Sequence, residues 1–490
     1  MTAFSTARVA RRVRAAHPSW FVLVAMAVFW AVLFGVLVWR RHDRFGSFGF
    51  DMGIFDQAVW LAARGKSFIT VRGLDLFGHH ANVAFYFLAP FSWMGAGPHF
   101  LNLLQVAGLA ACALPLYLLG RHRNLSPWVA LVPAAAFLAH PSTGFLAWEL
   151  FHPETVAVPF LLGAYLAAAK QEWRWFAVLL VVAVMWKEDV ALAAFFLGLL
   201  LLARGERKVA LWTMVLSLAW FLFVNRFLLG AVNGAGAFYD EFFGDLGGSP
   251  FDIAHTAASD PTRIVRKFGT DDARGYLWQM VSPFGMLPLL SPLVVLIGFP
   301  TALGNILSVN SFTRDITFHY SALPLAALAL GAVETLAWFR NRLARPWVTS
   351  TLAGVMLVTA LMGAKDWGVS PWGDEYRLRG WWPGTGDPAI DTKRFAVTLI
   401  PDGDAVSATY SFVPHLSHRD LIYEFPNPYG ERNWGIRGEK RHDPSKVRWL
   451  IADYRIMGAE DRAVFDSAID DYEFEIVLER DGIVVARRTG

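Results

Sequence analysis

Long apolar stretches recur along most of this chain, and they constrain its fold more than any other feature. Through residue 364 they are separated by short turns, several of them rich in arginine and lysine. About 20 apolar residues can cross a bilayer as a helix, because a helix satisfies its own backbone hydrogen bonds. Charged residues make up 17% of the chain, against about 25% in soluble domains. The sequence therefore predicts a polytopic α-helical membrane protein.

The apolar stretches predict about 11 membrane-spanning helices. The first stretch is too long for a signal peptide and no cleavage site follows it, so we expect it to be retained. The two stretches on either side of Ser291 and Pro292 could be divided differently. The expected spans lie near residues 19–39, 98–120, 126–147, 154–170, 174–187, 189–203, 208–230, 275–290, 292–309, 320–339 and 347–364.

Basic residues predict the orientation of these spans, since cytoplasmic turns are enriched in lysine and arginine. The N-terminus is expected in the cytoplasm because four arginines precede the first span: Arg8, Arg11, Arg12 and Arg14. Alternation then places four basic turns on the same side: residues 121–123, 170–174, 204–208 and 340–345. Three arginines just beyond the first span oppose this orientation: Arg40, Arg41 and Arg44. The later turns agree with one another and decide the prediction.

The composition changes abruptly after Ala364. Residues 365–490 are polar and rich in proline, glycine and aspartate, with short apolar stretches that predict strands. An odd number of spans would place this part outside the cytoplasm. We therefore divide the chain into a transmembrane domain, 1–364, and a small extracytoplasmic α/β domain, 365–490. Its expected elements are strands near 405–409, 421–425, 447–451 and 474–478 and a helix near 459–468.

Several functional classes are excluded by composition and motif content. The net charge of +3 is too small to suggest a nucleic-acid partner. The single cysteine, Cys112, excludes an intramolecular disulfide and any site with several cysteine ligands. The sequence contains no phosphate-binding glycine loop, nucleophile elbow or paired-histidine zinc motif.

The predicted first outer loop contains the first candidate site. Asp51 precedes apolar residues with a helical period, and Gly65 would end that helix, so we expect a short amphipathic helix in the membrane interface. Asp51 could be the N-cap of this helix, a general base held at the membrane surface, or both, since an N-capping carboxylate has a fixed orientation. Asp56 lies about one helical turn further on and is the alternative base.

Three more outer turns combine charged residues with apolar flanks, and histidines extend the set. Charges at membrane depth are costly, so such residues are functional candidates, although solvated turns remain the alternative. A divalent metal could bind these histidines and acids, but their spacing does not support one and we predict none. The turns and histidines are Glu149, His152 and Glu154; Lys187, Glu188 and Asp189; His319 and Tyr320; and, in the first loop, His79 and His80.

These motifs resemble, in matching order, a large bacterial family of multi-pass membrane proteins catalogued as a domain of unknown function. The family is related to the GT-C superfamily of membrane glycosyltransferases, and the resemblance covers residues from about 45 to 480. It rests on residues 50–60, Gly78-His79, Phe151 to Glu154, Lys187 to Asp189, His319-Tyr320 and Ser407 to Pro426.

The resemblance implies many spans, interfacial helices in a long first outer loop, and an acidic residue in that loop that acts as base. It also implies a sugar donor linked to polyprenyl phosphate and a location in the bacterial plasma membrane. Asp51 stands in the expected place. The chain departs from the pattern in having a single acid there rather than a tandem pair, so either Asp51 or Asp56 could be the base.

The chemistry of such a transfer suits these residues. Because the phosphate leaving group is already anionic, the reaction needs a carboxylate to deprotonate the acceptor hydroxyl and cations or hydrogen-bond donors to stabilise the phosphate. Direct displacement would invert the anomeric carbon. We expect Asp51, Asp56, Glu149 or Glu154 to be catalytic. The expected substrate-binding residues are Arg72, His79, His80, His152, Lys187, Glu188, Asp189, His319 and Tyr320.

The leading prediction is thus a glycosyltransferase that acts at the outer face of the membrane on a lipid-linked sugar and a cell-envelope glycan or protein acceptor. A transporter or flippase of a lipid-linked substrate is the alternative, and a non-catalytic assembly or sensor protein is a third. A transporter should place its charges near the midplane, often in repeated halves. Here the charges lie at one set of helix ends and no repeat is visible. We therefore expect Asp51, His79, Glu149, His152, Glu154, Lys187, Glu188 and His319 to line one outer cavity.

Overall fold

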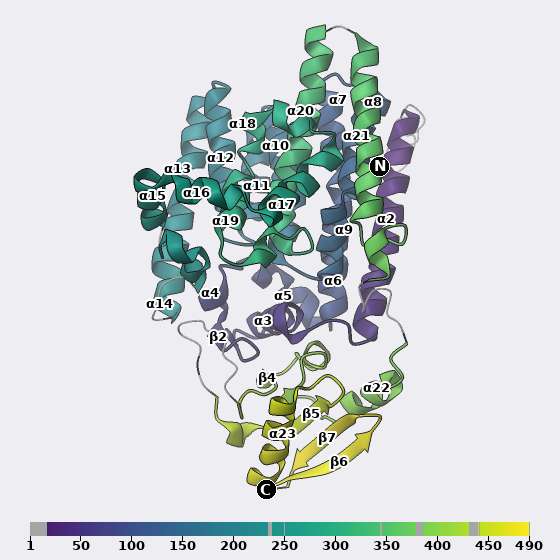
Figure 1. Cartoon of the computed structure of the whole chain (residues 1–490), viewed down its shortest axis with the longest axis vertical. Coiled ribbons are helices and arrows are strands. Elements are labelled where there is room, and N and C mark those ends of the chain that lie inside the picture. The colour runs from purple at the N-terminus through teal and green to yellow at the C-terminus, as the bar shows by residue number, and fades with distance from the viewer. Residues whose placement is uncertain are drawn as a thin grey trace, which may run out of the picture.

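The computed structural model describes residues 17–233, 238–248, 250–343, 345–378, 386–430, 440 and 442–489. The four N-terminal arginines used to orient the chain lie outside these residues. Most of the helices form a bundle, and a sheet domain lies beyond one end of it (Figure 1). The elements of the first predicted outer loop lie between the bundle and the sheet domain (Figure 1).

Among the described residues, five helical segments are long and apolar enough to cross a membrane. They are α2 (Pro18–Asp43), the segment Pro98–His122 with α6 (Pro98–Ala111) and α7 (Ala113–His122), the segment Arg207–Val232 with α13 (Arg207–Phe223), the segment His319–Leu343 with α20 (Ala322–Leu343), and α21 (Pro346–Asp366). A bent pair, α8 (Pro127–Ala139) and α9 (Pro141–Trp148), makes a sixth if it is one span. Three shorter apolar helices coincide with predicted spans: α10 (Pro153–Ala169), α11 (Trp173–Val184) and α12 (Val190–Ala203).

The predicted spans at 275–290 and 292–309 are not continuous helices, so the expected count of about 11 spans is not confirmed. Gly285 and Met286 adopt left-handed backbone conformations, and prolines recur through the segment. Proline lacks the N–H that a helix interior requires, so it can break a helix. Apolar content alone does not reveal such breaks. The segment forms α17 (Asp271–Val281), η4 (Ser282–Phe284), η5 (Leu287–Leu290), α18 (Pro292–Val295) and α19 (Phe299–Leu307).

Neighbouring helices satisfy part of the backbone that this broken segment leaves unpaired. Thr335 of α20 donates a hydrogen bond from Oγ1 to the carbonyl oxygen of Leu287 over 2.8 Å. Thr359 of α21 donates one to the carbonyl oxygen of Pro283 over 3.2 Å. Irregular backbone is tolerated at membrane depth where protein covers it. Helix α20 is buried along most of its length, from Ala322 to Ala337.

The first outer loop contains η1 (Gly49–Gly53), α3 (Ile54–Ala62), strands β1 (Phe68–Ile69) and β2 (Leu74–Asp75), α4 (Leu76–His79) and α5 (Phe85–Trp93). The short helix predicted here is present as α3, but protein buries almost all of its residues. The large apolar side chains of Phe87 and Trp93 are exposed on α5 instead. The N-cap alternative for Asp51 is wrong: the N-cap of α3 is Gly53, and Asp51 lies in the tight turn η1.

In the part of the sheet domain that the structure describes, five strands lie in the order β4-β3-β5-β7-β6. Strand β3 is parallel to both β4 and β5, whereas β7 is antiparallel to β5 and β6. All four predicted strands and the predicted helix are present, and the sequence prediction missed β7. The boundary at residue 365 stays a prediction. The elements are α22 (Ile390–Thr398), β3 (Val406–Ala408), β4 (Ile422–Glu424), β5 (Trp449–Asp453), α23 (Ala459–Asp471), β6 (Phe474–Arg480) and β7 (Ile483–Arg488).

The segment between β3 and β4 packs against the first outer loop. The backbone N–H of Gly49 donates a hydrogen bond to the carbonyl oxygen of Tyr410, and Thr70 donates one to the carbonyl oxygen of Ile422, over 2.8 and 2.7 Å. A Cβ on Gly49 would clash with Oε2 of Glu424 and lie 3.1 Å from Cβ of Val413, so only glycine allows this close approach without rearrangement. The sheet domain thereby supports the turn that carries Asp51.

The basic turns lie together at one end of the bundle. His122 contacts the carbonyl oxygen of Ala169, and Gln171 donates a hydrogen bond to Glu206. The connection between α20 and α21 lies at the end of the bundle furthest from the sheet domain (Figure 1). The sheet and this basic connection are therefore at opposite ends of the molecule, as the predicted topology requires, while the orientation in the cell stays a prediction.

Candidate active site

Ionisable side chains from four parts of the sequence meet at the end of the bundle that faces the sheet domain. We call them the outer cluster, defined as Asp51 of η1, Glu149 at the end of α9, His152 and Glu154 at the start of α10, Lys187 before α12, and His319 of η7 (His319–Ser321). Glu149, His152, Glu154 and His319 sit at or next to a helix end, and Asp51 and Lys187 lie in the turns that precede α3 and α12. The helix ends therefore bring together residues that are up to 268 positions apart, counted from Asp51 to His319.

The two histidines form the centre of the outer cluster. Their rings stack with centroids 3.9 Å apart. His152 Nε2 lies 3.4 Å from Oδ2 of Asp51. His319 faces an acid through each nitrogen, with Nδ1 3.2 Å from Glu149 and Nε2 3.5 Å from Glu154. The imidazoles thus connect three carboxylates from separate elements.

Lys187 extends the cluster toward the turn before α12. Its Nζ donates a hydrogen bond to Glu154 over 2.7 Å and lies 3.9 Å from Asp189. The next residue, Glu188, accepts a backbone N–H from Ala81 over 3.0 Å and pairs with His80 Nδ1 over 2.7 Å. The predicted Lys-Glu-Asp turn is therefore joined both to the first outer loop and to the outer cluster.

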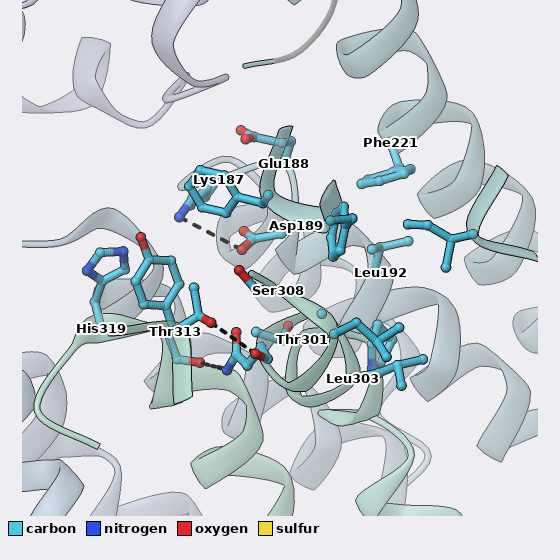
Figure 2. Close-up of a pocket in the computed structure, with 18 of the residues that line it drawn as sticks. Lys187, Glu188, Asp189, Leu192, Phe221, Thr301, Leu303, Ser308, Thr313 and His319 are labelled. Atoms are coloured by element: carbon cyan, nitrogen blue, oxygen red, sulfur yellow. Dashed lines mark hydrogen bonds and ion pairs between the residues drawn. The ribbon is translucent and has the colours of Figure 1, made fainter. Parts of the chain in front are cut away.

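A cavity of about 450 Å³ begins at this turn. Lys187, Asp189 and His319 lie on its polar side, and Leu192, Phe221 and Leu303 lie across from them (Figure 2). Its lining also includes the predicted residues His80, Glu188 and Tyr320 and the apolar residues Phe242 and Leu307. The cavity therefore suits a molecule with one charged end and one apolar end.

The expectation that eight residues line one cavity is met only in part. Lys187, Glu188 and His319 line it, whereas Asp51, Glu149, His152 and Glu154 adjoin it through the contacts of His319 and Lys187. His79 is buried, and its ring lies 4.4 Å from that of His80. The functional roles of all these residues stay predictions.

The environment controls the charge of residues outside the membrane helices. Burial alone would raise the pKa of Asp51, but the neighbouring His152 lowers it, so this carboxylate is ionised at neutral pH. Burial alone would lower the pKa of His152, but Asp51 and Glu149 raise it to about 9. Burial raises the pKa of Asp189, in the turn between α11 and α12, to about 6 despite the nearby Lys187.

Two predicted residues have surroundings that sequence reasoning did not anticipate. Asp56 accepts a hydrogen bond from Ser417 over 2.5 Å and lies 3.0 Å from Nε2 of His418, so it contacts the sheet domain. Arg72 is buried, with its guanidinium 6.0 Å from the ring centroid of Phe50. Ser417 and His418 were not predicted as site residues, because only the fold brings residues 361 positions apart into contact.

The sequence prediction also missed an ionisable cluster near the basic turns. Glu334 of α20 accepts hydrogen bonds from Arg123, Tyr165 and Arg204 over 2.8, 2.6 and 3.1 Å. A single glutamate in an otherwise apolar span was the available signal. We call these four residues the inner cluster. The apolar lining of the cavity had no comparable signal, because similar residues fill every span.

A family model accounts for nearly the whole chain. Residues 41–485 match the family described as "Predicted membrane protein (DUF2079)". The chain belongs to this family. The resemblance noted from the sequence is therefore confirmed, and this DUF2079 protein is a multi-pass membrane protein. No curated protein matches it.

Solved structures share the fold of this DUF2079 protein. ArnT from Cupriavidus metallidurans bound to undecaprenyl phosphate aligns over 96% of this chain and 98% of ArnT, with a TM-score of 0.54 and 12% identity. The apo state of the same ArnT aligns over 94% and 98%, with a TM-score of 0.51 and 12% identity. The apo oligosaccharyltransferase from Archaeoglobus fulgidus aligns over 95% and 74%, with a TM-score of 0.44 and 13% identity. The two ArnT structures, each with a TM-score above 0.5, show that this chain has an ArnT-like fold, and at this identity the likeness concerns fold alone.

Proposed function

We propose that this DUF2079 protein is a membrane glycosyltransferase that moves a sugar from a polyprenyl-phosphate donor to an acceptor hydroxyl, with inversion. The reaction would take place at the outer face of a bacterial plasma membrane. The observation that carries the proposal is the cavity in which Lys187 and His319 face Leu192, Phe221 and other apolar residues. Its charged side continues into the outer cluster.

The two sides of the cavity match the two parts of a lipid-linked sugar. Leu192, Phe221 and Leu303 offer an apolar surface to the polyprenyl chain, and burial of apolar surface contributes roughly 25 cal/mol per Å². Lys187 is placed to bind the phosphate, since an ammonium forms strong hydrogen bonds with phosphate oxygens. ArnT, which shares the fold, was crystallised with undecaprenyl phosphate.

The transfer step needs few groups. An acceptor hydroxyl oxygen attacks the anomeric carbon, and the bond from that carbon to the phosphate oxygen breaks. The hydroxyl proton passes to a carboxylate, and the bonding electrons leave with polyprenyl phosphate, whose added negative charge Lys187 stabilises. Attack opposite the leaving group inverts the anomeric configuration.

Asp51 suits the role of base better than Asp56. The side chain of Asp51 is 28% exposed, whereas that of Asp56 is 2% exposed and engaged by Ser417 and His418. Asp51 also adopts a left-handed backbone conformation with φ 65°, which is costly for a non-glycine residue and is often found at functional sites. Glu149 and Glu154 hold His319 and Lys187, which makes them the second choice.

The test uses the purified chain in liposomes with polyprenyl-phosphate sugars labelled in the sugar. We expect acceptor-dependent loss of label from the lipid together with release of polyprenyl phosphate. Movement of intact donor between leaflets without cleavage would instead identify the transporter alternative. The screen should include glycan and peptide acceptors, because both classes offer a hydroxyl group to the donor.

A further inference from the structure

Three residues of the outer cluster are arranged as a metal ligand set. Glu149, His152 and His319 each present a ligand atom, and these atoms all lie within 4.8 Å of one another. They come from the end of α9, the start of α10 and η7, so neighbouring helices hold them in place. Two imidazoles and one carboxylate can bind a divalent ion and leave a further coordination position open.

Two polar atoms of this set, Nε2 of His152 and Oε2 of Glu149, are buried and make no hydrogen bond, and the same holds for Oε2 of the adjoining Glu154. Nε2 of His152 lies 3.4 Å from Oδ2 of Asp51, an ion-pair contact rather than a hydrogen bond. Buried polar atoms are normally paired, so these atoms are available to a ligand. The side chain of His152 is 2% exposed and that of Glu154 is 5% exposed, which leaves little room for solvation from bulk water.

The orientation of both imidazoles favours metal binding. Nδ1 of His152 faces the carbonyl oxygen of Leu150 at 3.3 Å, so a proton on Nδ1 would be donated there and Nε2 would present its lone pair to the cluster. His319 faces Glu149 through Nδ1, while its Nε2 faces Glu154. A metal-ligating histidine usually donates its second N–H to a carbonyl or carboxylate, which fixes the ring. Both histidines have such a partner.

The carboxylates around the two histidines also favour a bound cation. Asp51, Glu149 and Glu154 contact the two histidines, and Lys187 is the lysine that neutralises part of this charge. Buried carboxylates without compensating charge are costly. A divalent cation bound by Glu149, His152 and His319 would add positive charge beside all three carboxylates.

We propose that Glu149, His152 and His319 bind one divalent transition-metal ion, with Glu154 orienting His319. Nitrogen and oxygen ligands of this kind suit Zn²⁺, Fe²⁺ or Mn²⁺ better than Mg²⁺ or Ca²⁺, which prefer oxygen alone. His319 also lines the cavity beside Lys187 (Figure 2). The open coordination position could therefore take a phosphate oxygen of the donor. That role rests on the proposed function, whereas metal binding itself does not.

The experiment measures metal binding without any donor. The full chain is purified in detergent, stripped with a chelator and dialysed against Zn²⁺, Mn²⁺ or Mg²⁺ separately, and bound metal is quantified by mass spectrometry and calorimetry. We expect about one equivalent of Zn²⁺ or Mn²⁺ and no saturable Mg²⁺ binding. Glu149→Gln and His319→Asn remove one ligand each and should weaken affinity at least about 100-fold, since loss of an outer-shell partner alone costs ~10–100-fold.

A matched control separates this site from the other histidines. His122→Ala removes a histidine at the far end of the bundle, where it contacts the carbonyl oxygen of Ala169, and should leave the stoichiometry and affinity unchanged. Monodisperse elution of every variant shows that it is folded. Equal metal affinity in wild type, Glu149→Gln and His319→Asn, or no saturable binding by the wild type, would overturn the proposal. Anomalous diffraction from a Zn²⁺-loaded crystal gives an independent result: a peak between Glu149, His152 and His319 supports the site, and a peak elsewhere alone refutes it.

Discussion

The two buried ionisable clusters of this protein differ in how completely their atoms are paired. In the inner cluster, Glu334 accepts hydrogen bonds from Arg123, Tyr165 and Arg204, and none of the buried side-chain nitrogen or oxygen atoms of these four residues lacks a partner. In the outer cluster, Glu149, His152 and Glu154 each have a buried atom without a hydrogen bond. The outer cluster also adjoins a cavity through His319 and Lys187.

The difference separates a structural role from a functional one. A satisfied network joins helices, here α7, α10, α12 and α20, because breaking any one pair leaves a buried charge. A network with unpaired buried atoms lowers the stability of the fold, and we expect it to be kept where a ligand supplies the missing hydrogen bonds or metal bonds. The inner cluster is therefore expected to affect stability, and the outer cluster is expected to affect activity.

The largest effect is expected from Asp51→Asn. The amide keeps the shape of the side chain but accepts no proton, so transfer should fall by ~10²-fold or more while folding survives. The measurement is release of polyprenyl phosphate from the labelled donor. Asp56→Asn is the matched control, since Asp56 contacts Ser417 and His418 rather than the outer cluster. Turnover by Asp51→Asn at the wild-type rate would move the proposed base to Glu149 or Glu154.

Lys187→Gln should have the next largest effect. Lys187 is the ammonium on the polar side of the cavity, and a hydrogen bond to a charged group contributes about 1.5–3 kcal/mol. We therefore expect the KM for the lipid-linked donor to rise by roughly 10-fold or more. Steady-state kinetics over a range of donor concentrations tests this. An unchanged KM would show that the phosphate binds elsewhere.

Glu334→Gln should lower stability without lowering activity. The substituted amide would keep an acceptor oxygen but lose the charge that pairs with Arg123 and Arg204, whose side chains are 26% and 32% exposed. Partial exposure moderates the loss, which we place at about 1–3 kcal/mol. Thermal unfolding in detergent measures it. A fall in turnover with an unchanged unfolding midpoint would contradict the structural role of the inner cluster.

The smallest effect is expected from Asp189→Asn, which should raise stability at neutral pH, whereas Glu334→Gln should lower it. Burial raises its pKa to about 6, so between pH ~4 and 6 the folded protein holds a proton that the unfolded chain releases. Stability should therefore fall as pH rises through this window. Asp189→Asn should remove that dependence and raise stability at pH 7 by roughly 1 kcal/mol, a value reduced because the side chain is 31% exposed. Unfolding midpoints of both proteins at pH 4, 5, 6 and 7 give the comparison, and parallel pH curves would show that Asp189 ionises normally.

The sequence by itself determined the class of the protein and most of its elements. Apolar stretches of membrane length and the polar composition after Ala364 depend only on local residue content, so they can be recognised without knowledge of the tertiary structure. Strands β3 to β6 and helix α23 were also predicted from local residue content. Local content misled at residues 275–309, where prolines and the left-handed Gly285 and Met286 break helices that hydropathy alone would continue.

The candidate site shows more clearly which features a sequence pattern leaves undetermined. Charges between apolar spans identified Glu149, His152, Lys187 and His319 as candidates, because such charges are costly in a membrane without a function. Only the tertiary structure decided that Asp51 adjoins His152 while Asp56 pairs with Ser417 and His418. Those contacts join residues more than 100 positions apart. A local sequence pattern does not show which distant residues will come into contact. The packing of the helix ends against the sheet domain determines those contacts.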